Sequence, residues 1–277
     1  MTAATLASGK GHRDENFPVA SRLISPRHRA PVMAFYHFAR AADDIADNPT
    51  ASEAEKLAGL TAMANGLTGA RDDEPTASAL REVLHAHGLD RQHALDLIAA
   101  FTQDVTKLRY ADWDELIDYC RLSAMPVGRY VLDVHGESRE TWPMSDALCA
   151  ALQVINHLQD CAKDYRDLDR VYIPADALAA TGASIEDLDK PAATPALRQT
   201  IADLARRTSA LLDEAEGFSR AIVDRRLGIE VAVIHTLARD LVARLLKRDP
   251  LSERVHHRKL EALAIAARAA AKRALWR

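Results

Sequence analysis

The sequence is poor in cysteine and carries little net charge, and each feature argues against one class of protein. Only three of its 277 residues are cysteines, and no two of them form a Cys-x-x-Cys pair. Cys120, Cys149 and Cys161 therefore predict reduced thiols rather than a disulfide framework. The formal net charge is -4, whereas nucleic-acid-binding domains are usually basic. The low net charge predicts that the protein binds no nucleic acid. Because the N-terminal segment does not resemble a signal peptide, we expect a cytoplasmic protein.

Long apolar runs and strand-like alternation are also missing. No uncharged apolar segment approaches the roughly 20 residues that a membrane-spanning helix needs. Aromatic residues make up 5% of the chain, while Ala and Leu are abundant, and this composition favours helix over strand. Hydrophobic residues make up 48% and charged residues 27%, as in ordinary globular proteins. We predict one all-α domain over residues 1–277, with residues 1–14 flexible.

Helical periodicity extends through almost the whole chain. Ser52 with Glu55 is a helix-start signal, and Gly69 and Gly88 are helix-stop signals. The connector 182–195, rich in Gly, Pro and Ala, is expected to be a surface loop. Helices are predicted over residues 27–47, 52–69, 75–87, 90–109, 112–136, 145–167, 195–220, 222–247 and 251–275.

One predicted helix contains helix-breaking residues. The segment SAMPVGR places Pro126 and Gly128 inside the helical pattern of residues 112–136. Proline removes a backbone hydrogen bond from a helix interior. The segment is either a break between two short helices or a bend that widens a cavity.

Two apolar helices each carry a pair of aspartates four residues apart. Asp43 and Asp47 lie in RAADDIADN, and Asp160 and Asp164 lie in NHLQDCAKDYRDLDRVYIP. Side chains at this spacing share one helix face. Carboxylates gathered in apolar surroundings repel one another, and a divalent cation relieves the repulsion. Oxygen ligands alone suit Mg²⁺, which also binds phosphate oxygens.

An exposed helix edge with basic partners would explain a single pair. Two pairs, each with cations and aromatic side chains nearby, favour a site for a polyprenyl diphosphate instead. These neighbours are Arg40, Tyr36 and Phe38 at the first pair, and Lys163, Arg166, Arg170, Tyr165 and Tyr172 at the second.

The same segments resemble a known family, the squalene and phytoene synthases. YHFARAADDIAD resembles the first aspartate motif of the family, and NHLQDCAKDYRDLDRVYIP resembles the second. YCRLSAMPVGR resembles its kinked middle helix. Within the family, ENFPVAS, YCRLSAMPVGR and NHLQDCAKD are most similar to the branch of bacterial hopanoid biosynthesis that forms hydroxysqualene.

The resemblance implies an all-α isoprenoid-synthase bundle around a central cavity, with Mg²⁺ as cofactor. By matching position it implies metal ligands at Asp43, Asp44, Asp47, Asp160 and Asp164. It also implies catalytic roles for Tyr36, Tyr119, Asn156 and Tyr172. Substrate binding is implied for Asn16, Phe17, Arg40, Gln159, Lys163, Arg170 and Arg254.

The chain departs from condensing members of the family at two places. Glu15-Asn16-Phe17-Pro18 replaces a Ser-rich segment, and Gln159 replaces an Arg before the second motif. Both changes disfavour binding of a second diphosphate. We therefore expect conversion of presqualene diphosphate and water to hydroxysqualene, without NADPH and with substrate supplied by a presqualene diphosphate synthase. The alternative is head-to-head condensation of two farnesyl diphosphates.

Three other interpretations stay open at this point. Two Glu-x-x-His patterns, Glu82 with His85 and Glu253 with His256, match the ligand spacing of di-iron helical bundles. A non-enzymatic helical scaffold would need neither aspartate pair. The basic C-terminal helix could attach peripherally to the inner face of a membrane, or simply pack on the bundle with a solvated face. His157, a lone histidine on a helix, is interpreted as structural.

Overall fold

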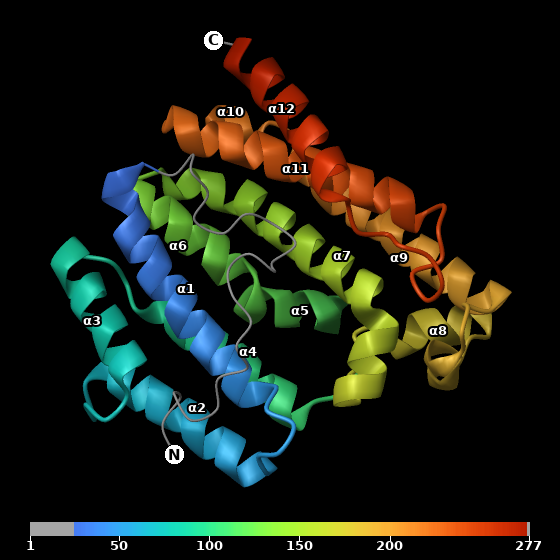
Figure 1. The fold of residues 1–277 in the computed structure, drawn as a ribbon, viewed down its shortest axis with the longest axis horizontal. Helices are drawn as coiled ribbons and strands as arrows, with labels where there is room; N and C mark the ends of the chain where they lie inside the picture. Colours follow the sequence, from blue (N-terminus) through green and yellow to red (C-terminus); the bar gives the residue numbers. More distant parts are fainter. Residues whose placement is uncertain (1–24, 276–277) are drawn as a thin grey trace. The chain divides into compact units, whose positions relative to one another are not determined.

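The computed structural model describes residues 25–275, so Asn16 and Phe17 lie outside the described residues. Within this range the chain is α-helical, with one isolated β-bridge between Arg109 and Val171 and no β-strand (Figure 1). The prediction of an all-α fold is therefore confirmed. The chain forms two compact units, residues 25–107 with 122–138 and residues 108–121 with 139–275. A single domain over the whole chain stays a prediction.

The first unit is a group of helices packed around α1 (Figure 1). Pro26 occupies the first turn of α1, where a missing backbone N–H costs nothing. A capping box between Ser52 and Glu55 starts α2, as the sequence predicts. The helices are α1 (Pro26–Ala46), α2 (Glu53–Thr68), α3 (Pro75–His87), α4 (Gln92–Thr106) and α6 (Met125–His135).

An apolar core fixes α1 against its neighbours in this unit. Phe35 stacks on Tyr130 of α6 with ring centroids 4.0 Å apart. The Tyr130 hydroxyl donates a hydrogen bond of 3.0 Å to the Pro31 carbonyl. Phe38 on α1 and Met63 on α2 are fully buried. This packing orients the C-terminal turns of α1, which carry the first aspartate motif.

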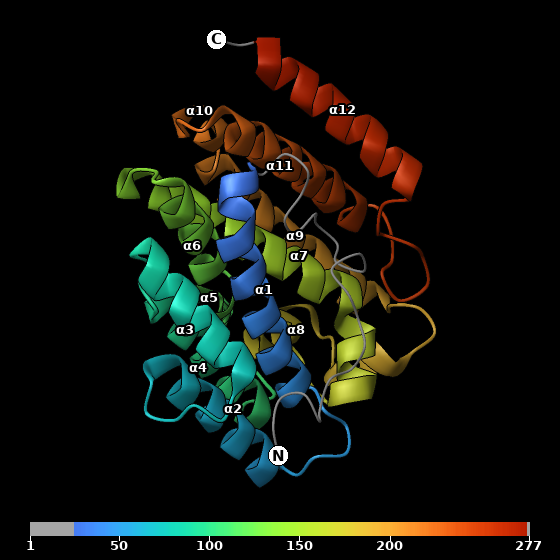
Figure 2. The ribbon, with the colours of Figure 1, turned by 60° about the vertical axis from the view of Figure 1, so that its left-hand side comes forward.

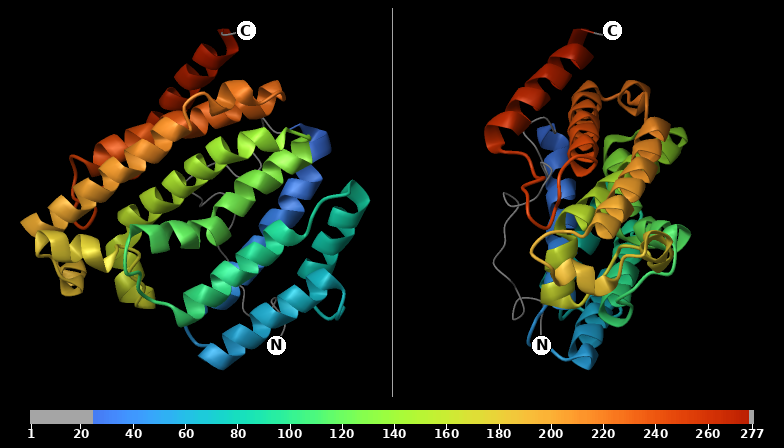
Figure 3. Two further views of the ribbon diagram at one scale, coloured as in Figure 1. Left: turned by 180° about the vertical axis from the view of Figure 1, so that it is seen from behind. Right: turned by 90° about the vertical axis from the view of Figure 1, so that its right-hand side faces the viewer.

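The second unit is built on the long helix α7, which packs against α9 and α11 (Figure 3). The helix α12 packs on α11 (Figure 2). Asp224 caps the N-terminus of α11 by accepting backbone N–H bonds from Arg226 and Leu227. The elements are most of α5 (Trp113–Ser123), the 3-10 helices η2 (Arg139–Thr141) and η3 (Ile185–Asp189), α7 (Trp142–Leu168), α8 (Ala175–Thr181), α9 (Pro195–Glu214), α10 (Phe218–Ala221), α11 (Arg225–Leu245) and α12 (Lys259–Leu275).

Several predicted boundaries are wrong for local reasons. The helix predicted over 112–136 is two helices, because Pro126 lies in the first turn of α6 rather than inside a continuous helix. The predicted loop 182–195 contains η3, which begins at a capping box formed by Ser184 and Asp187. The last helix begins at Lys259 rather than residue 251, because Asp249 organises a turn with the N–H of Leu251 and the hydroxyl of Ser252.

Candidate functional site

The C-terminal turns of α1 hold an acidic cluster, defined here as Asp43, Asp44 and Asp47. Arg40, one turn earlier, reaches both of the first two carboxylates. Its guanidinium lies 2.8 Å from Asp43 and 2.5 Å from Asp44. Asp44 is buried, whereas the side chain of Asp43 is 32% exposed. The structure thus joins Arg40 to the acidic cluster.

One cation does not neutralise this cluster. The pKa of Asp43 is raised to about 7, first by burial and then by the negative charge of Asp47, against the opposing effect of Arg40. Asp44 and the buried Asp104 of α4 raise it further. A carboxylate in this state is poised to accept either a proton or a metal ion. The donor set consists of carboxylate oxygens, which suit a hard divalent cation such as Mg²⁺.

The second aspartate motif lies on α7, and a histidine side chain lies near each of its two aspartates. His256 Nε2 lies 3.6 Å from Asp160 Oδ1. His157 Nδ1 lies 4.0 Å from Asp164 Oδ2. Both aspartates are partly exposed, with side-chain exposures of 36% and 20%. The acidic cluster belongs to the first unit and this motif to the second.

Next to Asp164 the second unit holds an aromatic cluster, defined here as Tyr110, Tyr119, His157 and Tyr172. Tyr172 is at its centre. The Tyr172 ring stacks on His157 with ring centroids 3.5 Å apart, and its centroid lies 5.4 Å from that of Tyr119 and 5.5 Å from that of Tyr110. All four side chains are buried. Burial and the charge of Arg170 lower the pKa of His157 to about 3, so its imidazole is neutral at pH 7.

The segments after α4 and α7 hold this cluster together. Val171 donates its backbone N–H to the Leu108 carbonyl at 2.9 Å, and Ala175 donates to the Tyr110 carbonyl at 2.9 Å. These hydrogen bonds hold Tyr172 beside Tyr110. Asp169 ends α7 in the left-handed backbone conformation, with φ 52°, and its carboxylate forms an ion pair with Arg109. The turn redirects the chain so that Tyr172 lies over the preceding helix.

The remaining predicted residues of the second unit differ in their surroundings. Gln159 is buried, and neither amide atom has a hydrogen-bond partner among the described residues. Arg170 is buried, and Lys163 is exposed. Arg254 donates to the His256 and His257 carbonyls at 3.3 and 3.1 Å. Asn156 is half-buried on α7, one turn before Asp160.

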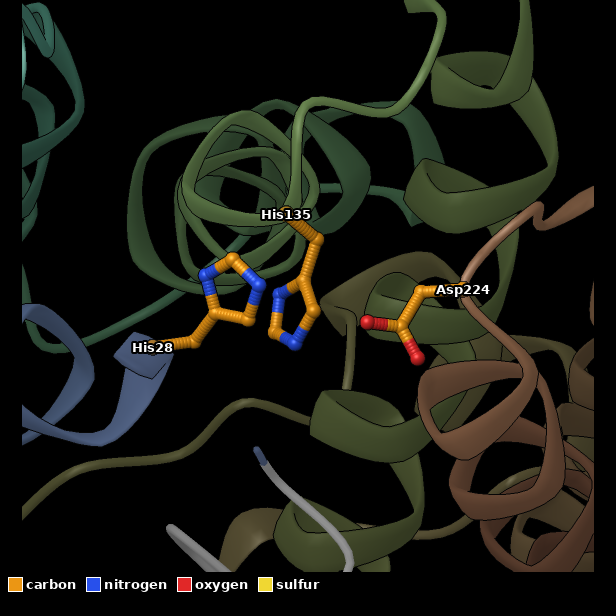
Figure 4. Close-up of side chains that lie close together, drawn as sticks. All are labelled: His28, His135 and Asp224. Atoms are coloured by element: carbon orange, nitrogen blue, oxygen red, sulfur yellow. The ribbon is translucent and has the colours of Figure 1, made fainter. Parts of the chain in front are cut away.

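A histidine pair lies at the opposite end of α1 from the acidic cluster (Figure 4). The rings of His28 and His135 have centroids 4.2 Å apart. Nδ1 of His135 bonds to the Val131 carbonyl at 2.8 Å, and Arg27 donates to Nε2 of His28 at 2.8 Å. The pair thus has local partners in the first unit.

Comparison with known proteins settles the family. The squalene/phytoene synthase family model matches residues 11–261. The chain belongs to the squalene/phytoene synthase family. It is 58% identical to a hydroxysqualene synthase of Zymomonas mobilis, covering 99% of this chain and 93% of the relative. It is 55% identical to a hydroxysqualene synthase of Rhodopseudomonas palustris, covering 94% and 90%.

A solved structure supports the same fold for this squalene/phytoene synthase. The crystal structure of a squalene synthase from Alicyclobacillus acidocaldarius matches with a TM-score of 0.69 and 29% identity, over 98% of this chain and 93% of that one. Membership of this family of enzymes argues against the interpretations of the chain as a di-iron protein and as a non-enzymatic scaffold. Locally, Glu253 accepts the Asp249 backbone N–H at 2.8 Å, and His256 faces Asp160.

Sequence reasoning missed three residues around the two aspartate motifs. Asp104 is buried on α4 and follows Leu97 by seven residues, so the apolar periodicity of α4 carried a signal for it. His157 was interpreted as structural, and it is buried with its ring stacked on Tyr172. His256 and Tyr110 carry no local signal, because their partners are distant in sequence.

Proposed function

We propose that this chain converts presqualene diphosphate and water to hydroxysqualene and diphosphate. The observation that carries the proposal is the identity of 58% and 55% to hydroxysqualene synthases over nearly the whole chain. Ionisation of an allylic-like cyclopropylcarbinyl diphosphate requires charge neutralisation at the leaving group and an apolar surround for the cation. The acidic cluster with Arg40 and the aromatic cluster have the chemistry for these two tasks.

The carboxylates of both motifs fit the role of metal ligands in this reaction. Asp43 and Asp47 on α1, and Asp160 and Asp164 on α7, are each proposed as Mg²⁺ ligands, and Asp44 would assist while it anchors Arg40. The raised pKa of Asp43 supports this role, because burial and the negative charge of Asp47 outweigh the effect of Arg40. When bound, the metal supplies Lewis-acid neutralisation of the leaving diphosphate.

Basic side chains would bind the diphosphate oxygens. Arginine suits this task because its planar donors form paired charge-assisted hydrogen bonds. Arg40 offers such donors beside the acidic cluster, and Lys163 adds an exposed ammonium on α7. Arg170 and Arg254 are assigned the same role, while Asn16 and Phe17 are proposed substrate contacts outside the described residues.

Tyrosine faces would stabilise the carbocation after the carbon–oxygen bond breaks. The buried rings of Tyr119 and Tyr172 present negative π-faces and exclude bulk water. Tyr36 on α1 and Asn156 on α7 are assigned to the reacting end of the substrate. Adding water to the rearranged cation changes no net oxidation state, so no NADPH is consumed.

Gln159 favours this reaction over condensation of two farnesyl diphosphates. Its amide is 6% exposed and carries no charge, whereas an Arg at this position would offer a cation to a second diphosphate. The substrate must then come from an enzyme that condenses two prenyl diphosphates head to head. A presqualene diphosphate synthase is the functional partner that this chemistry requires.

The test is to incubate the purified chain with Mg²⁺ and, separately, presqualene diphosphate or farnesyl diphosphate. Extracted lipids are then analysed by mass spectrometry, with an EDTA-treated sample as the metal control. Hydroxysqualene from presqualene diphosphate alone, lost in EDTA, is expected. A C30 product from farnesyl diphosphate, with presqualene diphosphate left unconverted, would contradict the proposal.

A second proposal is that α12 rests on an anionic lipid surface. Within residues 25–275 no helix is both long and apolar enough to cross a membrane. The side of α12 away from α11 nevertheless exposes Leu260, Leu263 and Leu275 by 81%, 66% and 83%. Basic residues flank this stripe, as in helices that lie in a membrane interface. They are Lys259, Arg268 and Lys272.

Sedimentation with vesicles tests this surface. The chain is expected to bind vesicles containing phosphatidylglycerol, and Leu260→Ser with Leu263→Ser should weaken binding at least about tenfold. Val223→Ser is the matched control, because Val223 is 88% exposed and lies outside α12. Equal binding by the double variant and the parent, or by the chain lacking residues 262–277, would contradict it.

A further inference from the structure

His157 is a buried histidine to which the proposed binding of metal and diphosphate assigns no role. It is 8% exposed on α7, and its ring stacks on Tyr172 at 3.5 Å with an interplanar angle of 17°. Its centroid is 6.0 Å from that of Tyr119. The imidazole therefore belongs to the aromatic cluster that is proposed to surround the carbocation.

The two ring nitrogens of His157 have different surroundings. Nδ1 lies 4.0 Å from Asp164 Oδ2, which is beyond direct hydrogen-bond distance. Nε2 is buried and has no hydrogen-bond partner among residues 25–275. Buried polar atoms of proteins are bonded to protein or to ordered water in the great majority of cases. An Nε2 that is unpaired among the described residues can bind a small polar molecule.

The hydrogen-bonding groups of the ring decide what that molecule can be. A neutral imidazole presents one N–H donor and one bare nitrogen that accepts a hydrogen bond. Water can donate an O–H to the bare nitrogen and still direct an oxygen lone pair elsewhere.

We propose that His157 binds and orients the water molecule that captures the carbocation. This inference rests on the proposed function and assigns a catalytic residue to its last step. The water oxygen forms the new C–O bond with its lone pair. The resulting oxonium loses one proton, which the released diphosphate accepts, so one water is consumed and nothing is oxidised or reduced.

The aromatic cluster explains why water adds once and in one place. Tyr110, Tyr119 and Tyr172 cover the imidazole with buried rings, which offer π-faces to a cation. Such a wall excludes bulk water, so only a hydrogen-bonded molecule reaches the cation. Without that molecule the cation is expected to lose a proton and become a C30 hydrocarbon.

His157→Phe separates the two steps, because phenylalanine keeps the stack on Tyr172 but cannot bind water. Diphosphate release and hydroxysqualene are measured in the same reaction with presqualene diphosphate and Mg²⁺. Release is expected to stay within about threefold of the parent, while hydroxysqualene per diphosphate falls at least about tenfold and hydrocarbon appears. His157→Gln, which keeps an acceptor, should retain the alcohol as its main product.

His235→Phe is the matched control, since His235 on α11 bonds to the Leu212 carbonyl at 2.8 Å and should leave the product ratio unchanged. If His157→Phe does not fold, His157→Leu provides the same comparison. An unchanged ratio of alcohol to diphosphate in a folded variant would overturn the role of His157. Failure of the proposed function looks different, because the parent itself would then form no hydroxysqualene.

Discussion

The two aspartate motifs share one spacing but differ in how their charge is balanced. On α1, Arg40 contacts both Asp43 and Asp44 within 2.8 Å. On α7, imidazoles lie 3.6 Å from Asp160 and 4.0 Å from Asp164. The first motif therefore has a permanent cation in direct contact, whereas imidazoles lie at longer distances from the second.

This difference shows that a repeated sequence pattern does not imply two equivalent halves of a site. Arg40 forms an ion pair with Asp44, while burial and the negative charge of Asp47 raise the pKa of Asp43 to about 7. The α7 motif instead adjoins the aromatic cluster through His157. We infer that α1 mainly serves the leaving diphosphate and that α7 also serves the carbon skeleton.

The largest expected effect removes a metal ligand from each motif. Asp43→Asn and Asp160→Asn should each slow diphosphate release about a thousandfold, because each takes a charged oxygen from the metal site. Asp167→Asn, at an exposed position on α7, should stay within about twofold of the parent. Parental turnover by either ligand variant, measured with the circular dichroism spectrum unchanged, would refute the assignment for that motif.

Removing the cation of the first motif should cost stability. Arg40→Gln takes from the buried Asp44 carboxylate its partner at 2.5 Å, which is expected to cost about 3 kcal/mol of unfolding free energy. Adding Asp44→Asn should restore most of the loss, because the buried charge is then gone. Urea unfolding of both variants measures this, and an additive double variant would show that the pair is not coupled.

The raised pKa of Asp43 predicts a pH dependence in the metal-free protein. The folded pKa near 7 exceeds the ordinary value of 3.8, so stability from this carboxyl is present in acid and is lost as pH rises toward 7. Asp43→Asn should therefore raise Tm in EDTA at pH 8 by a few degrees and have no effect near pH 4. Solvent screening limits the gain to at most about 2 kcal/mol.

Differential scanning calorimetry at several pH values, with EDTA or with Mg²⁺, measures the Asp43 effect. Mg²⁺ should stabilise the parent more at pH 8 than at pH 6, because protons compete for Asp43. The variant should lose most of this dependence. Parallel pH profiles for the parent and Asp43→Asn in EDTA would show that Asp43 is not the perturbed group.

The smallest effect is expected at the imidazole beside Asp160. His256→Gln removes a contact of 3.6 Å between partly exposed groups, so the apparent Mg²⁺ affinity should change by only a few fold. Activity titrations with Mg²⁺ give this value, and His87→Gln at an exposed site is the control. A loss as large as that of Asp160→Asn would mean that His256 has a direct catalytic role.

The sequence predicts the long helices of this fold well, because amphipathic periodicity over many residues is a strong signal. The helix predicted over 75–87 matches α3 in both bounds. Short elements such as α8 and η3 were missed, because one or two turns carry no measurable period. The break at Pro126 was one of two alternatives, and only the backbone of α6 decides it.

The candidate site was predictable where residues lie close in sequence. Arg40 was noted as a cation close to Asp43 in sequence, and the two side chains form an ion pair. Contacts between distant segments were not predictable, and the stack of His157 on Tyr172 depends on the turn at Asp169 and on pairing with residues 108–110. Asp104 lies on the apolar face of α4, where the periodicity marks it, but its proximity to Asp43 depends on the packing of α4 against α1.

The most direct test of the account is the origin of the product oxygen. The chain is incubated with presqualene diphosphate and Mg²⁺ in water enriched in ¹⁸O, and the alcohol is analysed by mass spectrometry. The account predicts hydroxysqualene that carries the solvent label in its hydroxyl, because the carbon–oxygen bond breaks before water adds. An unlabelled alcohol that retains the cyclopropane would show cleavage at phosphorus and would contradict it.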